Sequence, residues 1–154
     1  MKKRIGKVIE IFSAKKGESG LPRPVVKKLN LIENFGIEDD KFAGDEIDKS
    51  VMVIGLKSYE IAKENGIELE LGSYGENILF DFDPHELKIG DTIKIGDATL
   101  EITQKCTLCS HLSIFHKYLP KLIKNHRGLY CKITKGGEVT KGSQVIFGPV
   151  NQTV

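Results

Sequence analysis

Residues 92–103 have the sequence Thr92-Ile-Lys-Ile-Gly-Asp-Ala-Thr-Leu-Glu-Ile-Thr103, in which apolar and polar side chains alternate around a central Gly96-Asp97. Alternation with a period of two indicates a strand that buries one face. Gly and Asp tolerate the positive φ that a two-residue turn between strands requires. The stretch therefore predicts a β-hairpin with strands at Thr92–Ile95 and Ala98–Thr103.

Strand patterns of the same kind recur along the chain, and glycine-rich turns separate them. They predict further strands at Gly6–Ser13, Val25–Ile32, Ser50–Gly55, Ile78–Phe82, Leu129–Thr134 and Gln144–Phe147. We place a turn at Gly136-Gly137 and helices at Leu56–Asn65 and Ser110–Lys124, the second interrupted by Pro120. Short, regularly spaced strands favour a mainly β fold, a barrel or sandwich with a few peripheral helices. No segment resembles a linker, so residues 1–154 are expected to form a single domain.

The composition narrows the classes of function. The 154 residues carry a formal net charge of +2 and are 40% hydrophobic and 29% charged, a balance that does not favour a nucleic-acid-binding surface. No apolar run approaches the roughly 20 residues of a membrane-spanning helix, and Gly6, Lys7 and Glu10 interrupt the N-terminal apolar stretch, unlike an export signal. Three cysteines fit a reducing compartment better than a disulfide framework, so we expect a cytoplasmic protein.

Cys106-Thr-Leu-Cys109 is the sharpest chemical feature and lies between an expected strand and an expected helix. The dipole of a helix stabilises a cysteine at its start as the thiolate, and Lys105 adds a nearby positive charge. A thiolate attacks persulfides and binds soft metal ions. The alternative is that both cysteines pack as small apolar side chains.

A zinc site is a further alternative, because His111 and His116 follow the two cysteines. The spacing disfavours it, because on a helix Cys109 and His111 point to different sides and finger-type sites separate their ligand pairs by a longer stretch. A thioredoxin-like redox pair is disfavoured as well, since the sequence shows no βαβ unit.

Three other stretches could bind ligands, and each also has a structural interpretation. In Tyr74-Gly75-Glu76-Asn77, backbone amides and the Asn77 side chain could hold an oxyanion or the edge of a pterin, or the stretch could be a plain turn. Arg127 could form a bidentate contact to a phosphate or carboxylate, or be solvated at a helix end. The acidic residues from Glu38 to Asp45 could bind a hard cation, although their order is not that of an EF-hand and a solvated loop is favoured.

Taken in order, these landmarks resemble the MOSC domain, the module named for the C-terminal part of molybdenum cofactor sulfurases. The resemblance covers residues 6–147, nearly the whole chain. It rests on Tyr74-Gly-Glu-Asn-Ile78, Leu87-Lys-Ile-Gly-Asp91, Ile95-Gly-Asp-Ala98, Thr103-Gln104 before the cysteines, Arg127-Gly-Leu-Tyr130 and Gly136-Gly-Glu-Val139. The Lys105-Cys106-x-x-Cys109 form is similar to that of stand-alone bacterial members.

The resemblance implies a MOSC-type β-barrel and a role in sulfur transfer or in handling the molybdenum cofactor (molybdopterin). It places the family's cysteine at Cys109, as sulfur acceptor or molybdenum ligand, with Cys106 assisting. The residues implied to bind the cofactor are Gly75, Glu76, Asn77, Arg127 and Lys49.

The chain departs from the family pattern in three places. Members often carry Gly-Asp-x-His where this chain has Asp39-Asp40-Lys41-Phe42, and an arginine where it has Lys49. The late Gly-Asp of the family becomes Gly142-Ser143. Loss of an arginine fork and of a histidine weakens the oxyanion binding implied for that side of the site.

We therefore expect a sulfur carrier or molybdenum-cofactor-binding domain, related to sulfur transferases, in which Cys109 carries a persulfide or binds the molybdenum ion. Because the sequence shows no pyridoxal phosphate domain, a pyridoxal phosphate-dependent cysteine desulfurase is one expected partner, and a molybdenum-cofactor biosynthesis or acceptor protein is another. Two alternatives stay open: a molybdoenzyme that reduces N-hydroxylated compounds, and a non-catalytic regulatory module of molybdenum or sulfur metabolism. No nucleic-acid or membrane partner is expected.

Overall fold

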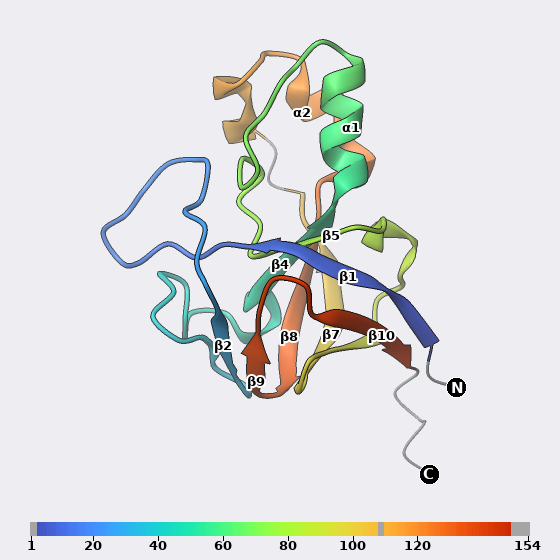
Figure 1. Cartoon of the computed structure of the whole chain (residues 1–154). Coiled ribbons are helices and arrows are strands. Elements are labelled where there is room, and N and C mark those ends of the chain that lie inside the picture. Colours follow the sequence, from blue (N-terminus) through green and yellow to red (C-terminus); the bar gives the residue numbers. More distant parts are fainter. Residues whose placement is uncertain (1–2, 108–109, 149–154) are drawn as a thin grey trace.

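A computed structural model of the chain describes residues 3–107 and 110–148, whose strands form a closed β-barrel with a small second sheet beside it (Figure 1). The barrel strands follow one another in the order β1, β10, β6, β7, β8, β4, β5. Neighbouring strands are antiparallel except β4 and β5, which run parallel. The mainly β barrel with a few peripheral helices that the sequence predicted is confirmed.

The predicted strands lie where the sequence pattern places them, although β2 occupies only the second half of the strand expected over Val25–Ile32. The barrel contains β1 (Lys3–Ile11), β4 (Val51–Gly55), β5 (Ile78–Phe80), β6 (Thr92–Ile95), β7 (Ala98–Lys105), β8 (Leu129–Lys135) and β10 (Gln144–Gly148), and the small sheet contains β2 (Leu29–Ile32), β3 (Gly36–Ile37) and β9 (Gly137–Val139). The helices are α1 (Leu56–Glu64) and α2 (Leu119–Leu122), and the 3-10 turns are η1 (Ile47–Lys49), η2 (Pro84–Glu86), η3 (Ser110–Ile114) and η4 (Lys124–His126). Within the described part of the chain, no helix has the length and apolar character needed to cross a membrane.

The β6–β7 hairpin shows why its sequence alternates. Ile93 lies opposite Leu100, and Ile95 lies opposite Ala98. All four side chains are fully buried in the core inside the barrel. Gly96 has a φ of 59° at the turn, a conformation that glycine adopts without steric cost. The predicted hairpin is confirmed.

The strands β4 and β5 differ from the hairpin because they are buried on both faces. Val53 and Ile78 belong to the core inside the barrel, whereas Ile54 and Leu79 belong to a second core that includes residues of α1 and α2. A continuous apolar run suits a strand with two buried faces. These two strands therefore join the barrel to the helices, which lie side by side at one end of it (Figure 1).

Besides the shorter β2 strand, two predicted elements are wrong in detail. The helix expected over Ser110–Lys124 is divided into η3, α2 and η4, with Pro120 in the first turn of α2. Proline lacks an N–H and its ring clashes with the preceding turn, so it begins a helix more readily than it continues one. The turn expected at Gly136-Gly137 is shorter than predicted, because only Gly136 lies between β8 and β9, and Gly137 is the first residue of β9. That strand passes so close to the β6–β7 turn that a Cβ atom at residue 137 would lie 2.7 Å from backbone atoms of Asp97 and Ala98.

Gly55 forms a tight contact between the end of β4 and the loop that follows β5. A Cβ atom there would lie 2.2 Å from the carbonyl oxygen of Phe82 and 2.9 Å from Cδ of Pro84. Since the backbone must move to admit a methyl group, we expect Gly55→Ala to lower the free energy of unfolding by about 3 kcal/mol. Urea denaturation measures this loss.

Gly66→Ala, just after α1, is the control for this substitution. A Cβ atom there meets nothing within 4 Å, and only the positive φ of 77° is unfavourable, at a cost of about 1 kcal/mol. A loss in Gly55→Ala no greater than that in Gly66→Ala would show that the contact at Gly55 is not tight.

Candidate functional site

A pocket of about 570 Å³ lies where the starts of β4 and β8 meet the η3 turn and three loops. Its size is within the range of about 300–1,000 Å³ that is usual for small-molecule sites. The polar side chains that line it are those of Arg23, Asp40, Lys41, Asp45, Glu46, Lys49, Ser50, Tyr74, Asn77, His111, Arg127 and Tyr130. The cavity is therefore lined by charges of both signs, with cationic groups on several sides.

The pocket collects several of the residues that the sequence implied for cofactor binding, namely Lys49, Gly75, Asn77 and Arg127. They come from distant segments, which the pairing of β4 with β5 and with β8 brings together. Glu76 and Cys106 are buried and are not among the residues that line the cavity. Cys109 lies outside the residues that the structure describes.

Arg127 is the most buried charged residue of the pocket, with 3% of its surface exposed. Its Nη1 atom donates a hydrogen bond to the carbonyl oxygen of Tyr74 at 2.8 Å, and Nη2 lies 3.3 Å from Nε2 of His111. Partial burial, together with the charges of Arg127 and Arg23, lowers the pKa of His111, so this ring is neutral at neutral pH. These two partners, the Tyr74 carbonyl and the His111 ring, are neutral groups that help to hold the guanidinium in place.

Arg23 and Asp40 also line the pocket. The sequence analysis did not consider Arg23, and it considered Asp40 only as part of an acidic segment. Asp40 is 5% exposed and accepts hydrogen bonds from the Ser13 hydroxyl at 2.6 Å and the Phe42 N–H at 3.0 Å. Burial lowers the pKa of Arg23, and the attraction of Asp40 and Glu76 opposes this lowering only in part. The Nε atom of Arg23 is buried without a hydrogen-bond partner among the described residues. A buried donor of this kind indicates a place for a ligand or water acceptor.

Glu76 is fully buried and contacts α1 instead of the cavity. Its Oε2 atom accepts a hydrogen bond from the Tyr59 hydroxyl at 2.5 Å, and that hydroxyl accepts one from the Gly72 N–H at 2.9 Å. Burial raises the pKa of Glu76, and its hydrogen bonds and the charge of Arg127 oppose the rise only in part. Oε1 has no partner in the described part of the chain, which a neutral acid tolerates better than a carboxylate. The side chain therefore ties residues 72–77 to α1.

Asn77 joins the strands behind the pocket. Its Oδ1 atom accepts a hydrogen bond from the Met52 N–H at 3.0 Å, and its Nδ2 atom donates to the Phe12 carbonyl oxygen at 3.2 Å. The backbone N–H of Asn77 donates to the Met52 carbonyl oxygen, and that of Gly75 donates to Gly72. These are the amides that the sequence analysis considered for binding an oxyanion, and they are engaged within the protein.

Cys106 lies next to the pocket and is 3% exposed. Its Sγ atom is 3.5 Å from the hydroxyl of Tyr130, a residue of the pocket lining. Its backbone N–H donates to the Gly128 carbonyl oxygen at 2.9 Å. Cys131 is fully buried in the barrel core, where burial raises the pKa of its thiol. Cys131 therefore behaves as a small apolar side chain.

The described residues contain no group of three His, Cys, Asp or Glu side chains that could hold a metal ion. In the acidic segment, Asp40 bonds to Ser13 and Phe42. The ring of His116 accepts a hydrogen bond from the Tyr118 N–H at 3.2 Å. The zinc alternative also requires Cys109, which is outside residues 3–107 and 110–148, so it is not tested.

Comparison with known proteins agrees with these landmarks. The MOSC domain family matches the sequence over residues 34–146. Among solved structures, the YuaD protein from Bacillus subtilis has a TM-score of 0.80 and 18% identity, over 96% of this chain and 98% of that chain. YiiM from Escherichia coli has a TM-score of 0.72 and 16% identity, over 97% and 73%, and YiiM from Geobacillus stearothermophilus has 0.69 and 17%, over 99% and 78%. Identities this low show a shared fold alone. No curated protein matches the sequence.

The raised pKa of Glu76 makes a prediction about stability and pH. A carboxyl group whose pKa is higher in the fold than the value of 4.5 for the free side chain stabilises the protein fully below pH 4.5. This contribution is lost as the pH rises toward the folded pKa, with a slope of up to about 1.4 kcal/mol per pH unit. We expect Glu76→Gln to remove this slope, as measured by urea denaturation between about pH 5 and pH 8.

Glu64→Gln, on the exposed side of α1, is the matched control and should keep the pH dependence of the wild type. Parallel stability curves for Glu76→Gln and the wild type would mean that Glu76 is ionised in the folded protein.

Proposed function

The chain belongs to the MOSC domain family, and on this premise we propose that it is a sulfur carrier in which Cys109 accepts sulfane sulfur. The observation that carries the proposal is a cavity that the cationic side chains of Arg127 and Lys49 line together with the neutral ring of His111. His111 follows Cys109 by two positions in the sequence. A deprotonated persulfide is an anion, which cationic side chains at close range stabilise.

The proposed transfer is an exchange between a thiolate and a persulfide. The Cys109 thiolate attacks the terminal sulfur of a donor persulfide, so that a new S–S bond forms at Cys109. The S–S bond of the donor breaks, and the donor leaves as a thiolate. One S–S bond replaces another, so no external oxidant or reductant is needed. In this proposal Arg127 and Lys49 attract the anionic sulfur, and Cys106 assists from behind Tyr130.

The proposed donor is a cysteine desulfurase. Release of sulfane sulfur from free cysteine is chemistry of pyridoxal phosphate, and a separate enzyme of that class would supply it. The proposed acceptor is a protein that makes or uses the molybdenum cofactor, because the family is named for sulfurases of that cofactor. Both partners are inferred from the chemistry of the cargo and from family membership.

Binding of the molybdenum cofactor is a second role that the same cavity favours. The buried guanidinium of Arg127 and the Nε atom of Arg23, which has no hydrogen-bond partner within residues 3–107 and 110–148, fit a ligand that carries a phosphate group. Arg127, Arg23 and Lys49 would hold this group, and Cys109 would offer the thiolate that soft metal ions prefer. When bound, the molybdenum centre would supply redox chemistry, whereas the residues described here would bind and orient the cofactor.

Intact-mass analysis tests sulfur loading. The purified protein is incubated with a cysteine desulfurase and cysteine, and we expect a gain of about 32 Da, one sulfur atom, that a reducing thiol reverses. Cys109→Ser should show no gain, because the accepting thiolate is absent.

Cys131→Ala is the matched control. Its thiol is fully buried and its pKa is raised, so loading should equal that of the wild type. Absence of a mass gain in the wild type, or an equal gain in Cys109→Ser, would refute the proposed role of Cys109.

A further inference from the structure

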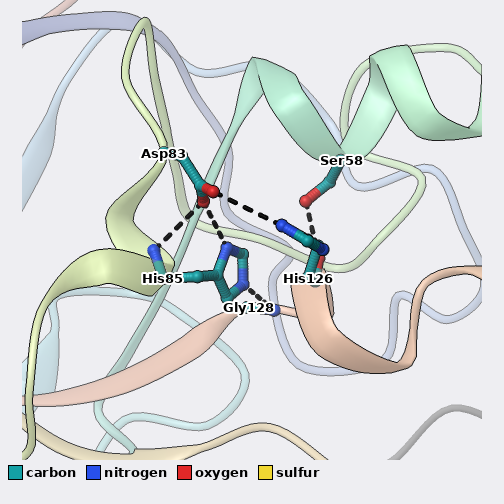
Figure 2. A network of polar contacts seen from close by, with 5 residues as sticks. All are labelled: Ser58, Asp83, His85, His126 and Gly128. Carbon is teal, nitrogen blue, oxygen red and sulfur yellow. Dashed lines mark hydrogen bonds and ion pairs between the residues drawn. The ribbon is translucent and has the colours of Figure 1, made fainter.

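The loop after β5 carries a linked set of polar residues that the proposed function does not use (Figure 2). Asp83 caps η2, where its Oδ1 atom accepts hydrogen bonds from the His85 N–H at 3.1 Å and from Nδ1 of the His85 ring at 2.6 Å. The other ring nitrogen, Nε2, accepts a hydrogen bond from the Gly128 N–H at 2.8 Å. The ring of His126 faces the other carboxylate oxygen of Asp83, with Nε2 at 3.5 Å from Oδ2.

The two partners of the His85 ring fix its tautomer. A backbone N–H can only donate, so Nε2 carries no proton and the ring proton is on Nδ1, facing Asp83. Only 10% of the His85 side chain is exposed, so both contacts are largely shielded from water. Protonation of the ring would set an Nε2–H against the Gly128 N–H, and that hydrogen bond would be lost.

Gly128 connects His85 to the pocket. It directly follows Arg127, and its carbonyl oxygen accepts the hydrogen bond from the Cys106 N–H at 2.9 Å. Its φ of 116° favours glycine, and a Cβ atom there would lie 2.8 Å from Sδ of Met52. Gly128 is therefore joined to Arg127 through the chain and to the Cys106 backbone, just after β7, through a hydrogen bond.

We propose that His85 is a positioning residue for the pocket: by accepting the Gly128 N–H, it holds the Arg127 guanidinium and the Cys106 backbone in place. Loss of this acceptor, by substitution or by protonation of the ring, releases both. The link between His85 and Arg127 is independent of the chemistry at Cys109. Only its effect on sulfur loading rests on the proposed function.

The surroundings of His85 give this link a pH dependence. The groups that face the ring are Asp83 from its own loop, His126 from η4 and Lys105 from the end of β7. Burial, together with the charges of His126 and Lys105, lowers the pKa of His85 below 6.5, and Asp83 opposes this only in part. The hydrogen bond to Gly128 is therefore complete above pH 6.5 and is lost as the pH falls through the folded pKa.

Asp83 stays ionised in this pH range. Burial alone would raise its pKa, but the hydrogen bonds from His85 and the nearby ring of His126 outweigh burial and lower it. Asp83 therefore does not account for the loss of the Gly128 hydrogen bond on acidification, and the His85 ring is the group that accepts this bond.

Nuclear magnetic resonance of the ¹⁵N-labelled full chain tests the proposal through the Gly128 amide and the side-chain N–H groups of Arg127. Between about pH 8 and pH 5, we expect the wild-type Gly128 signal to move with a midpoint below 6.5. In the same step, the protection of the Arg127 side-chain protons, which is the exchange rate of an unprotected guanidinium at the same pH divided by theirs, should fall at least about tenfold. A Gly128 signal that moves while the protection of Arg127 stays constant would overturn the proposal.

Two substitutions separate the functions of the ring. In His85→Gln, the amide oxygen can take the place of Nε2, so the Gly128 signal should stay in its bonded position without the pH step. In His85→Asn, the shorter side chain can still donate to Asp83 but cannot reach Gly128. The Gly128 amide and the Arg127 side-chain N–H groups should therefore give, at every pH, the signals that the wild type gives at low pH, which we call the released state. A wild-type spectrum for His85→Asn would overturn the proposal, as would a His126→Gln variant that reproduces the released state. If His85→Asn does not fold, the wild-type titration still decides.

Sulfur loading near neutral pH gives an independent readout. We expect His85→Asn to load about tenfold more slowly than the wild type, and His85→Gln to load nearly as fast. Equal rates for His85→Asn and the wild type would show that the link does not affect function. A wild type that never loads sulfur would refute the proposed function, and the resonance measurements would then decide the positioning role alone.

Discussion

The burial of the Arg127 charge is the constraint on which the pocket depends. A guanidinium that is 3% exposed must keep its hydrogen bonds, because an uncompensated buried charge is strongly destabilising. Two of its contacts are with Tyr74 and His111, which are 53 and 16 positions away in the sequence. The arginine therefore stays in place only if three segments keep their relative positions: the turn around Tyr74, the η3 turn and the start of β8.

Closure of the barrel fixes these relative positions. The start of β8 pairs with both β4 and β7, and Asn77 links β4 to the end of β1 through Met52 and Phe12. Glu76 binds the same turn to α1 through Tyr59. In the described part of the chain, the neutral polar groups behind the pocket bond to one another, and the cationic side chains of Arg23, Lys41, Lys49 and Arg127 line the cavity. Of the residues that the family resemblance indicated, Glu76 and Asn77 hold the surrounding backbone, whereas Lys49 and Arg127 line the cavity with positive charge.

Much of the fold could be predicted because its strands bury one face and show it as alternation, as in residues 92–103. The resemblance to a family indicated Lys49, Gly75, Asn77 and Arg127, which meet in one pocket. Arg23 gave no signal, because it stands alone between two prolines in a loop. The contact of Glu76 with Tyr59 depends on how α1 packs, and that of His85 joins residues 43 positions apart. Such contacts follow from tertiary packing, which no local pattern records.

The central claim is that the cationic side chains of the pocket stabilise an anionic sulfur at Cys109. Its most direct test is the pH profile of alkylation of the native protein, since Cys106 and Cys131 are buried and slow to react. We predict a midpoint below the value of about 8.5 for a free cysteine, and an upward shift of that midpoint in Arg127→Gln. A midpoint at about 8.5 in both proteins would contradict the claim and favour a non-catalytic MOSC module.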